Sequence, residues 1–357
     1  MIPVSKPYLP SRRKLDRYIN QIYKNCYLTN NGPLLQLLEK RLQKYLGVRN
    51  IICVANGSLA LQLVYKALDL KGEVITTPFS FVATTSTLVW EGLTPRFADI
   101  DPETLNISPD EIQKQISPQT CAILPVHVYG NPCDVNKIDN IAKEHGLKVI
   151  YDAAHAFGVK KNGQSVLNYG DASILSFHAT KLFHTVEGGA VVTNDDDLAK
   201  KIRSLINFGF DNGVSVMAGT NAKMNEFEAA MGLAVLDDID KIRNKRKELY
   251  QLYREGLGDM VDYQKWDEKS ECNHVYMPLM MDSEDQVISL TNILKGFGII
   301  SRRYFYPVLN ELCYVEGSEN KISLDVSKRI ICVPLYCGLS KKVINTVVSA
   351  VKQIKSI

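Results

Sequence analysis

The segment DASILSFHATKLFHTVEGGAVVTND, residues 171–195, carries the pattern on which the fold assignment depends. Two apolar, β-branched runs, 172–178 and 188–195, flank a turn that contains one lysine, Lys181. Runs of this kind bounded by polar residues and glycine predict strands. A lysine in such a turn is usually solvated, because lysine is mostly exposed in proteins. Burial of a lysine away from water lowers its pKa, and the neutral amine that results can attack an aldehyde. Other motifs have to decide between these two interpretations.

Further apolar runs upstream alternate with amphipathic segments. The expected strands are 50–57, 72–78, 121–130 and 147–155, and the expected helices between them are 58–70, 81–92 and 135–146. Strands that alternate with helices are typical of βαβ units in a mainly parallel sheet. The sequence therefore predicts an α/β fold.

The pattern changes near Asn221, where one long charged helix is expected to run to Gly256. The rest of the chain predicts strands and helices of a smaller α+β unit, at 274–281, 289–298, 329–338 and from 340 onward. A chain of 357 residues exceeds the ~250–300 residues at which single cores stop growing. We expect a large domain with an N-terminal arm over 1–240 and a small domain over 241–357.

Composition and charge restrict the class of protein. The net charge is only +3 and the basic residues form no single stripe, which argues against a nucleic-acid partner. No apolar run approaches the ~18–20 residues that span a bilayer, and the N-terminus has no apolar signal region, so we expect a cytoplasmic protein without a membrane partner. The eight cysteines form no C-x-x-C pair and no Cys/His metal spacing, so no metal site is expected. With nucleic acid and membrane excluded as partners, we expect a small-molecule substrate.

Polar residues follow two of the expected strands. Asp152 ends the strand in VIYDAAHAFG (149–158), at the edge where ligands bind in open α/β sheets. A carboxylate there suits a protonated pyridine nitrogen, although a helix N-cap fits equally well. Asn56, Gly57 and Ser58 lead another strand into a helix, whose free amides suit a phosphate. This strand-turn-helix occurs in many folds, so its specificity is low by itself.

Aromatic side chains follow the strand at 72–78. Phe79 and Phe81 lie in TTPFSFVATTS (76–86), and one of them is placed to cover a planar ring, whereas a core phenylalanine is the alternative. Phosphate-binding turn, aromatic residue, aspartate and lysine thus occur in chain order, each after an expected strand. Their joint arrangement is much more specific than any one of them.

Motifs spread over nearly the whole chain carry a family resemblance. They are IPVSKPYLP (2–10), YLTNNGPLLQLLEKRL (27–42), NGSLALQL (56–63), PFSFVATTSTLVWEGLTPRFADID (78–101), HVYGNPCDV (127–135), DAAHAFG (152–158), SFHATKLFHTVEGGAVVTND (176–195), TNAKMNEFEAAMGL (220–233) and GIISRRYFYP (298–307). The sequence resembles the sugar aminotransferases of the DegT/DnrJ/EryC1/StrS family, within the fold type I group of pyridoxal-phosphate enzymes. The resemblance implies a large domain with a mainly parallel seven-stranded sheet, a smaller C-terminal α+β domain and pyridoxal 5'-phosphate as cofactor.

The resemblance also implies roles for individual residues. Lys181 would form the Schiff base, Asp152 would hold the pyridine nitrogen and Phe81 would stack on the ring. The implied phosphate ligands are Gly57, Ser58 and Ser176. Asn221 would reach the phosphate of the neighbouring subunit, so a homodimer with shared active sites is implied.

The chain departs from the family pattern in a few positions. His155 stands where glutamine is usual, and it is expected to contact the phenolic oxygen of the cofactor, with a buried structural histidine as the alternative. Tyr151-Asp152 replaces the usual Glu-Asp pair, and Lys223-Met224 replaces the usual Arg-Met.

Substrate contacts are marked less clearly. The candidates are His178, His184, Glu187, Arg303 and Tyr306. Loop histidines often have no specific role, so a structural role stays open for both histidines. His127, at a strand start, is expected to be structural.

The family implies transfer of an amino group from L-glutamate to a nucleotide-linked keto sugar. SFHATK followed by EGG resembles the 4-aminotransferase branch, which implies dTDP-4-keto-6-deoxy-D-glucose as acceptor, dTDP-4-amino-4,6-dideoxy-D-glucose as product and a role in O-antigen or other surface polysaccharide biosynthesis. An aminotransferase for 3-keto sugars or aminocyclitols stays open. Lys181 argues against the dehydratase branch, which has histidine there, and the intact lysine and aspartate argue against a non-catalytic or regulatory relative.

Overall fold

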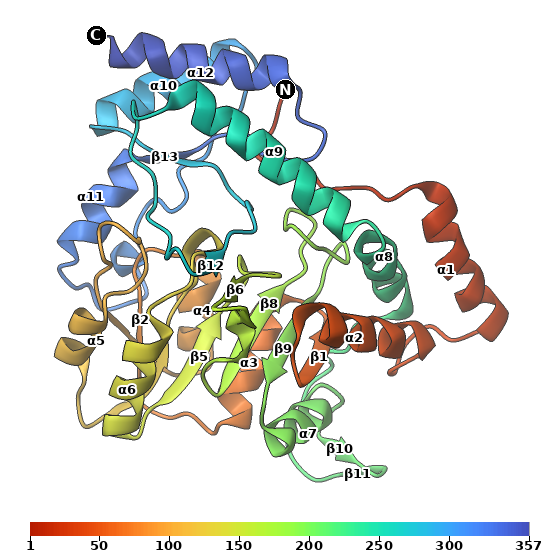
Figure 1. Cartoon of the computed structure of the whole chain (residues 1–357). Helices are drawn as coiled ribbons and strands as arrows, with labels where there is room; N and C mark the ends of the chain where they lie inside the picture. The colour runs from red at the N-terminus through yellow and green to blue at the C-terminus, as the bar shows by residue number, and fades with distance from the viewer. Residues whose placement is uncertain (357) are drawn as a thin grey trace.

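The computed structural model of the protein describes residues 1–356 and is built around a seven-stranded sheet with the order β1-β9-β8-β5-β4-β2-β3 (Figure 1). Its strands are β1 (Asn50–Val54), β2 (Glu73–Thr76), β3 (Thr94–Phe97), β4 (Thr120–Leu124), β5 (Lys148–Asp152), β8 (Ala172–Ser176) and β9 (Gly189–Thr193). Strand β9 runs antiparallel to its neighbours β1 and β8, and the other neighbouring pairs are parallel. The predicted α/β fold with a mainly parallel sheet is confirmed.

Helices cover both faces of this sheet, because successive strand residues point to opposite sides. Ile51 and Cys53 of β1 pack on one side, while Ile52 and Val54 pack on the other. The helices on the first side are α1 (Arg12–Asn25), α2 (Pro33–Leu46), α5 (Pro109–Gln115), α6 (Val135–His145) and α8 (Glu226–Leu236). Those on the second side are α3 (Gly57–Ala67), α4 (Val82–Trp90) and α7 (Asp196–Leu205). The sheet is therefore the middle of three layers.

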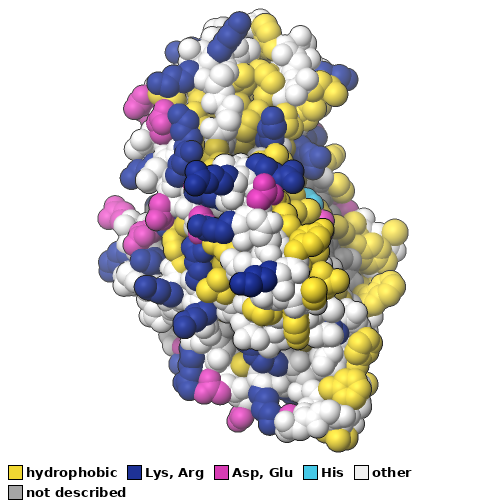
Figure 2. All heavy atoms as spheres, turned by 90° about the vertical axis from the view of Figure 1, so that its right-hand side faces the viewer, with side chains coloured by type: hydrophobic (Ala, Val, Ile, Leu, Met, Phe, Trp, Pro, Cys, Tyr) yellow, Lys and Arg dark blue, Asp and Glu magenta, His cyan; other side chains and the backbone are white. Residues whose placement is uncertain are grey.

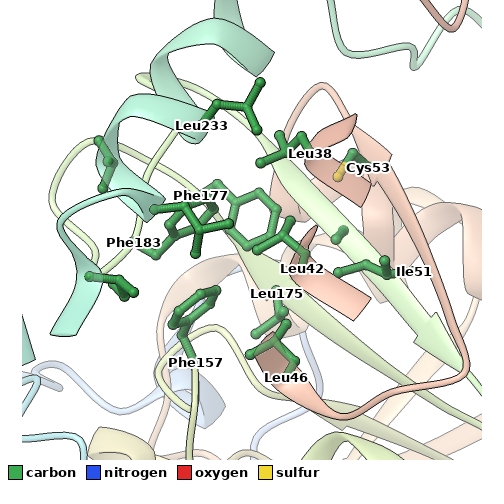
Figure 3. Packing of buried hydrophobic residues seen from close by; sticks show 14 of the residues in the cluster. Leu38, Leu42, Leu46, Ile51, Cys53, Phe157, Leu175, Phe177, Phe183 and Leu233 are labelled. Carbon is green, nitrogen blue, oxygen red and sulfur yellow. The ribbon is translucent and has the colours of Figure 1, made fainter. Parts of the chain in front are cut away.

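An aromatic cluster in the core anchors the segment that follows β8. Phe177 and Phe183 are buried, and their ring centroids lie 4.8 Å apart in an edge-to-face arrangement. Phe183 also stacks on Phe157 at 4.7 Å, and Leu38 and Leu42 of α2 complete the packing (Figure 3). Both ends of the loop 177–183 are thus fixed in the core, and Lys181 lies within that loop.

The C-terminal part of the chain has a core of its own. It consists of α9 (Ile239–Leu257), α10 (Glu284–Gly296), α11 (Lys321–Arg329), α12 (Lys341–Lys355), β13 (Pro278–Met280) and β14 (Ile330–Cys332). The remaining short strands are β6 (Lys160–Lys161), β7 (Gln164–Ser165), β10 (Phe210–Asp211), β11 (Val214–Ser215) and β12 (Ser270–Glu271). The helices and strands after α8 match the expected C-terminal α+β part, and the domain boundary at residue 240 stays a prediction. Within residues 1–356 no helix has the length and apolar character needed to cross a membrane.

The expected single helix from Asn221 to Gly256 is wrong, because the structure has two helices there, α8 and α9. The break falls at Asp237 and Asp238, whose carboxylates bind side chains of the N-terminal arm. The sequence pattern also missed strand β3, whose Pro95 and Arg96 do not resemble a core strand. Proline is tolerated because β3 lies at the edge of the sheet.

Candidate active site

Lys181 lies beyond the carboxyl end of β8, in the loop that the core phenylalanines anchor. Its backbone N–H donates to the carbonyl of His178 at 2.9 Å, which closes a tight turn. Burial lowers the pKa of Lys181 to about 8, against the opposing attraction of Asp152. Lys181 as a whole is half-buried, so the structure supports a partly desolvated amine rather than a fully solvated turn lysine.

Asp152 ends β5, the strand next to β8, and its side chain is buried. Its Oδ2 accepts a hydrogen bond from Thr84 Oγ1 at 2.8 Å, and its Oδ1 accepts one from the N–H of Ala154 at 3.1 Å. Burial raises the pKa of Asp152, and the two hydrogen bonds and the charge of Lys181 oppose this rise. Residues 154–155 form a turn, so Asp152 is not the N-cap of a helix.

The turn between β1 and α3 has the geometry of an anion site. Asn56 caps α3 by accepting from the N–H of Leu59 at 2.9 Å, and the first amides, those of Gly57 and Ser58, have no carbonyl within their own helix to bond. A Cβ at Gly57 would lie 3.1 Å from Cβ of Ser176. A Cβ at Gly189 would lie 2.7 Å from the amide nitrogen of Gly57. The glycines let these segments approach closely, and they bring Ser176 beside the first turn of α3.

The two candidate aromatic residues differ in exposure. Phe79 is fully buried and packs edge-to-face on Phe305 at 5.5 Å, whereas Phe81 is 56% exposed at the start of α4. Phe81 also lines a hollow of about 530 Å³ together with Arg302 and Tyr306. Of the two, only Phe81 has a free ring face.

His155 is buried, and its ring stacks on Phe305 with 5.8 Å between centroids. Its Nε2 lies 3.4 Å from the hydroxyl of Tyr276, and its Nδ1 has no hydrogen-bond partner within residues 1–356. Burial, with a further contribution from Lys181, lowers the pKa of His155 well below its usual value, so the ring is neutral.

The histidines near Lys181 have different surroundings. His178 is exposed, and its Nε2 lies 3.6 Å from Glu187 Oε1, so this pair lies at the surface of the loop. His184 is buried; its Nε2 donates to the carbonyl of Tyr8 at 2.7 Å and its Nδ1 accepts from the N–H of Val186 at 3.3 Å. With both nitrogens bonded, His184 joins the N-terminal arm to this loop instead of facing a ligand.

His127 has the structural role that the sequence suggested. It is fully buried and stacks on Tyr151 at 4.7 Å between centroids. Its Nδ1 accepts from the N–H of Cys133 at 3.1 Å, and burial lowers its pKa to about 3.

The remaining candidates lie farther along the chain. Arg303 pairs with Glu284 at 2.8 Å, and its guanidinium lies 3.5 Å from the ring centroid of Tyr306. Tyr306 is 46% exposed in the hollow beside Phe81, while Asn221 lies exposed in a segment that bridges to Asn207.

Sequence reasoning missed Thr84, Ser80 and Tyr276. Thr84 follows Phe81 by one helical turn, and this spacing indicates that the two residues share an end of α4. No sequence signal indicates that Thr84 reaches Asp152 or that Tyr276 reaches His155, because both contacts join segments far apart in the chain.

A model of the DegT/DnrJ/EryC1/StrS aminotransferase family matches residues 11–352. The chain belongs to this family. It is therefore an aminotransferase of a pyridoxal-phosphate-dependent family, and the predicted family and enzyme class are confirmed.

Named relatives of this family member cover nearly its whole length. The dTDP-4-amino-4,6-dideoxy-D-glucose transaminase of Shigella dysenteriae is 43% identical over 99% of this chain and 98% of its own, and that of Escherichia coli is 39% identical over 96% of each. The crystal structure of DesI in the presence of its TDP-sugar product matches with a TM-score of 0.94 at 36% identity, covering 99% of this chain and 92% of DesI. The family member thus shares both sequence and fold with sugar aminotransferases.

Proposed function

We propose that this aminotransferase transfers the amino group of L-glutamate to dTDP-4-keto-6-deoxy-D-glucose, giving dTDP-4-amino-4,6-dideoxy-D-glucose. The observation that carries the proposal is the desolvated Lys181, whose pKa is about 8, beside the buried Asp152 on the neighbouring strand. The names of the relatives at 43% and 39% identity support this substrate.

The residues of the site fit pyridoxal 5'-phosphate. Gly57 has no Cβ to crowd Ser176, so the Ser176 hydroxyl lies beside the free amides at the start of α3, and the unpartnered Nδ1 of His155 and the carboxylate of Asp152 are buried polar groups. The residues that would hold the cofactor are Gly57, Ser58 and Ser176 at its phosphate, Phe81 at its ring face, Asp152 at its ring nitrogen, His155 at its phenolic oxygen and Lys181 at its aldehyde carbon. When bound, the cofactor supplies an electron sink for the electrons released when the substrate Cα loses its proton.

Lys181 then acts as the base and acid of the reaction. An amine with a pKa of about 8 is neutral in a useful fraction of molecules near neutral pH, so Lys181 Nζ can accept a proton from the substrate Cα and would return it to C4′, the former aldehyde carbon of the cofactor. Asp152 keeps its negative charge opposite the ring nitrogen, where it holds a proton in place. His155 is neutral and offers one ring nitrogen as a hydrogen-bond donor, depending on its tautomer.

The substrate contacts belong to the same proposal. Arg302 and Tyr306 line the hollow beside Phe81, and Arg303 stacks on Tyr306, so cationic and aromatic groups lie next to the expected ring position. Such groups suit a nucleotide sugar, because arginine binds phosphate and aromatic rings pack on bases and sugars. His178 and Glu187 form the second candidate contact, at the surface of the Lys181 loop.

We also propose that the active unit is a homodimer in which Asn221 contacts the phosphate in the partner's site. The segment around Asn221 exposes several apolar side chains, namely Phe208, Phe210, Val214, Val216 and Phe227. Figure 2 displays hydrophobic side chains gathered along one edge and at the lower end of the face that it presents. Exposed apolar surface of this kind is typical of protein interfaces, and a second copy would cover it. Light scattering of the purified chain should give twice its mass of 40.0 kDa.

Absorbance and borohydride reduction test the cofactor assignment. The protein loaded with pyridoxal phosphate should have a visible band, and reduction should attach the cofactor to the peptide that contains Lys181. Lys181→Ala should abolish both, whereas Lys71→Ala, at an exposed lysine paired with Asp69, should change neither. A protein that stays colourless with added cofactor would contradict the proposal.

The acceptor is tested by offering dTDP-linked and UDP-linked 3-keto and 4-keto sugars with glutamate and measuring 2-oxoglutarate. We expect the dTDP-linked 4-keto sugar to react fastest. Preference for a 3-keto sugar or for an aminocyclitol ketone would move the chain to another branch of the family. Turnover of none of these ketones would overturn the sugar assignment.

A further inference from the structure

Two buried hydroxyl groups connect the start of α4 to Asp152. Thr84 Oγ1 donates to Asp152 Oδ2 at 2.8 Å, and Ser80 Oγ lies 2.8 Å from Thr84 Oγ1. Thr84 is 0% exposed and Ser80 is 3% exposed, so little water competes for these bonds. Ser80 also lines the hollow beside Phe81.

The direction of this chain follows from the number of protons. A hydroxyl group has one proton to donate, and Thr84 uses it toward a carboxylate that can only accept when ionised. The bond between Ser80 and Thr84 must therefore be donated by Ser80. Hydrogen bonds that point the same way polarise one another, and those to a charged acceptor are the stronger kind.

Thr84 makes this contact instead of the usual local one. A helical threonine commonly bonds the carbonyl of the preceding turn, as Thr87 does with Ala83 at 2.8 Å. The next residue, Thr85, is equally buried, yet its hydroxyl has no partner within residues 1–356. The contact of Thr84 is therefore specific to Asp152 and is not a general property of threonine in α4.

We propose that Ser80 and Thr84 form a hydroxyl relay that keeps Asp152 ionised and oriented toward the ring nitrogen of the cofactor, so that Thr84 is a positioning residue of the reaction. This inference rests on the proposed function. Phe81 and Thr84 lie one turn apart at the start of α4, so this helix end supplies both the ring-covering residue and the support of the carboxylate. Burial disfavours the charged form of Asp152, and the relay offsets this effect.

The test compares Thr84→Val with Thr84→Ser and Thr85→Val. Valine removes the hydroxyl at nearly constant volume, serine retains it, and the Thr85 variant makes the same chemical change at a hydroxyl without a partner. Each protein is titrated with pyridoxal phosphate and with the analogue whose ring nitrogen is replaced by a carbon, and the dissociation constants are measured by absorbance.

We expect Thr84→Val to weaken binding of pyridoxal phosphate about tenfold and to lower kcat by at least about as much, with little change in KM for glutamate. The same variant should bind the carbon analogue within about twofold of the wild type, because the analogue has no nitrogen for Asp152 to hold. Thr84→Ser should restore most of the affinity, and Thr85→Val should match the wild type.

Equal weakening for the cofactor and its analogue would overturn the relay, because it would indicate a general packing defect. So would an unchanged affinity and kcat in Thr84→Val while the wild type is active. If Thr84→Val does not fold, Ser80→Ala replaces it, with a smaller loss that again must vanish with the analogue. A wild type that binds no pyridoxal phosphate would overturn the proposed function itself, and the relay with it.

Discussion

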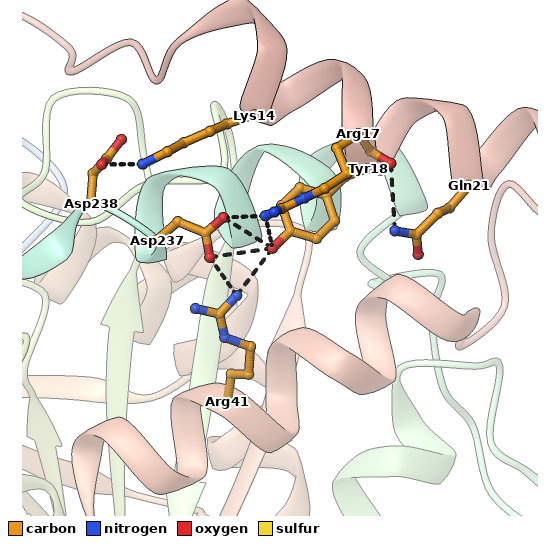
Figure 4. Close-up of polar contacts among 7 residues, drawn as sticks. All are labelled: Lys14, Arg17, Tyr18, Gln21, Arg41, Asp237 and Asp238. Carbon is orange, nitrogen blue, oxygen red and sulfur yellow. Dashed lines mark hydrogen bonds and ion pairs between the residues drawn. The ribbon is translucent and has the colours of Figure 1, made fainter.

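Two clusters of charged side chains in this molecule differ in their exposure to water. The first consists of Asp152 and Lys181, at the carboxyl ends of neighbouring strands. The second joins helices α1 and α2 to the end of α8 through Arg17, Arg41 and Asp237 (Figure 4). In the second cluster both arginines lie 2.7 Å from Asp237, and their side chains are 59% and 34% exposed.

The comparison shows that the number of ion pairs in a cluster does not predict its reactivity. The cluster at α8 has more and closer ion pairs. Asp237 is 16% exposed, but both arginines are in contact with water, which screens such pairs and makes their contribution small. In the first cluster, burial lowers the pKa of Lys181 to about 8 and raises that of Asp152, while the hydrogen bonds from Thr84 and Ala154 and the charge of Lys181 oppose the rise at Asp152. Two neighbouring ionisable groups with shifted pKa values at the carboxyl end of the sheet, rather than the number of ion pairs, mark the candidate active site.

The largest contrast is expected for the same substitution made in each cluster. Asp152→Asn removes the charge that holds the ring nitrogen protonated, and kcat should fall about 10²–10³-fold, as when one preorganised electrostatic contact is lost. Asp237→Asn should leave kcat within about twofold, since within residues 1–356 Asp237 contacts none of the candidate site residues and its arginine partners lie in contact with water. Steady-state kinetics at saturating glutamate and keto sugar measure both. Similar falls in the two variants would remove the distinction between the clusters.

A second test uses the pH dependence of stability of the cofactor-free protein. The pKa of Lys181 is about 8 in the folded chain and near the ordinary 10.5 in the unfolded chain. Between these pH values the unfolded chain binds more protons, so the contribution of Lys181 to the free energy of unfolding rises with pH, by about 3 kcal/mol in total. Urea denaturation of the wild type and of Lys181→Met measures it as the difference between the two curves.

The difference between these curves is needed because other groups titrate in the same range. Burial raises the pKa of residues such as Cys53 and Tyr129, which lowers stability as pH rises, but both proteins share this effect. Parallel curves for the wild type and Lys181→Met between pH 8 and 10.5 would contradict a desolvated Lys181. Lys71→Met, at an exposed lysine, is the matched control and should give a curve parallel to that of the wild type.

The sequence placed Asp152 and Lys181 together but gave no sign of the cluster around Asp237. The difference lies in how local the deciding contacts are. The carboxyl ends of parallel strands meet at one edge of a sheet, so strand patterns alone bring Asp152 and Lys181 together. The contact of Thr84 with Asp152 depends on how α4 packs beside β5. The break between α8 and α9 depends on bonds from Asp237 to Arg17 and Arg41, which lie more than 190 positions away. Local patterns carry no information on such contacts.

His184 illustrates the same limit close to the active site. It lies only three positions from Lys181, and sequence proximity made it a substrate candidate. The turn directs it toward the N-terminal arm, where the backbone carbonyl of Tyr8 accepts a hydrogen bond from its Nε2. The local pattern likewise did not distinguish Phe79 from Phe81, which only the family resemblance did, and packing shows that Phe79 is the buried ring and Phe81 the exposed one.

The smallest expected effect concerns the stability contributed by the second cluster. Asp237→Asn removes the negative charge and one of the two acceptor oxygens shared by Arg17, Arg41 and Tyr18, and the free energy of unfolding should fall by about 1 kcal/mol, because water replaces most of the lost contacts. Arg17→Ala removes only the most exposed partner and should cost less than about 0.5 kcal/mol. Urea denaturation of the cofactor-free protein measures both. A loss of about 3 kcal/mol or more for Asp237→Asn is the size expected when one partner of a buried pair is removed, and it would mean that burial does not distinguish this carboxylate from Asp152.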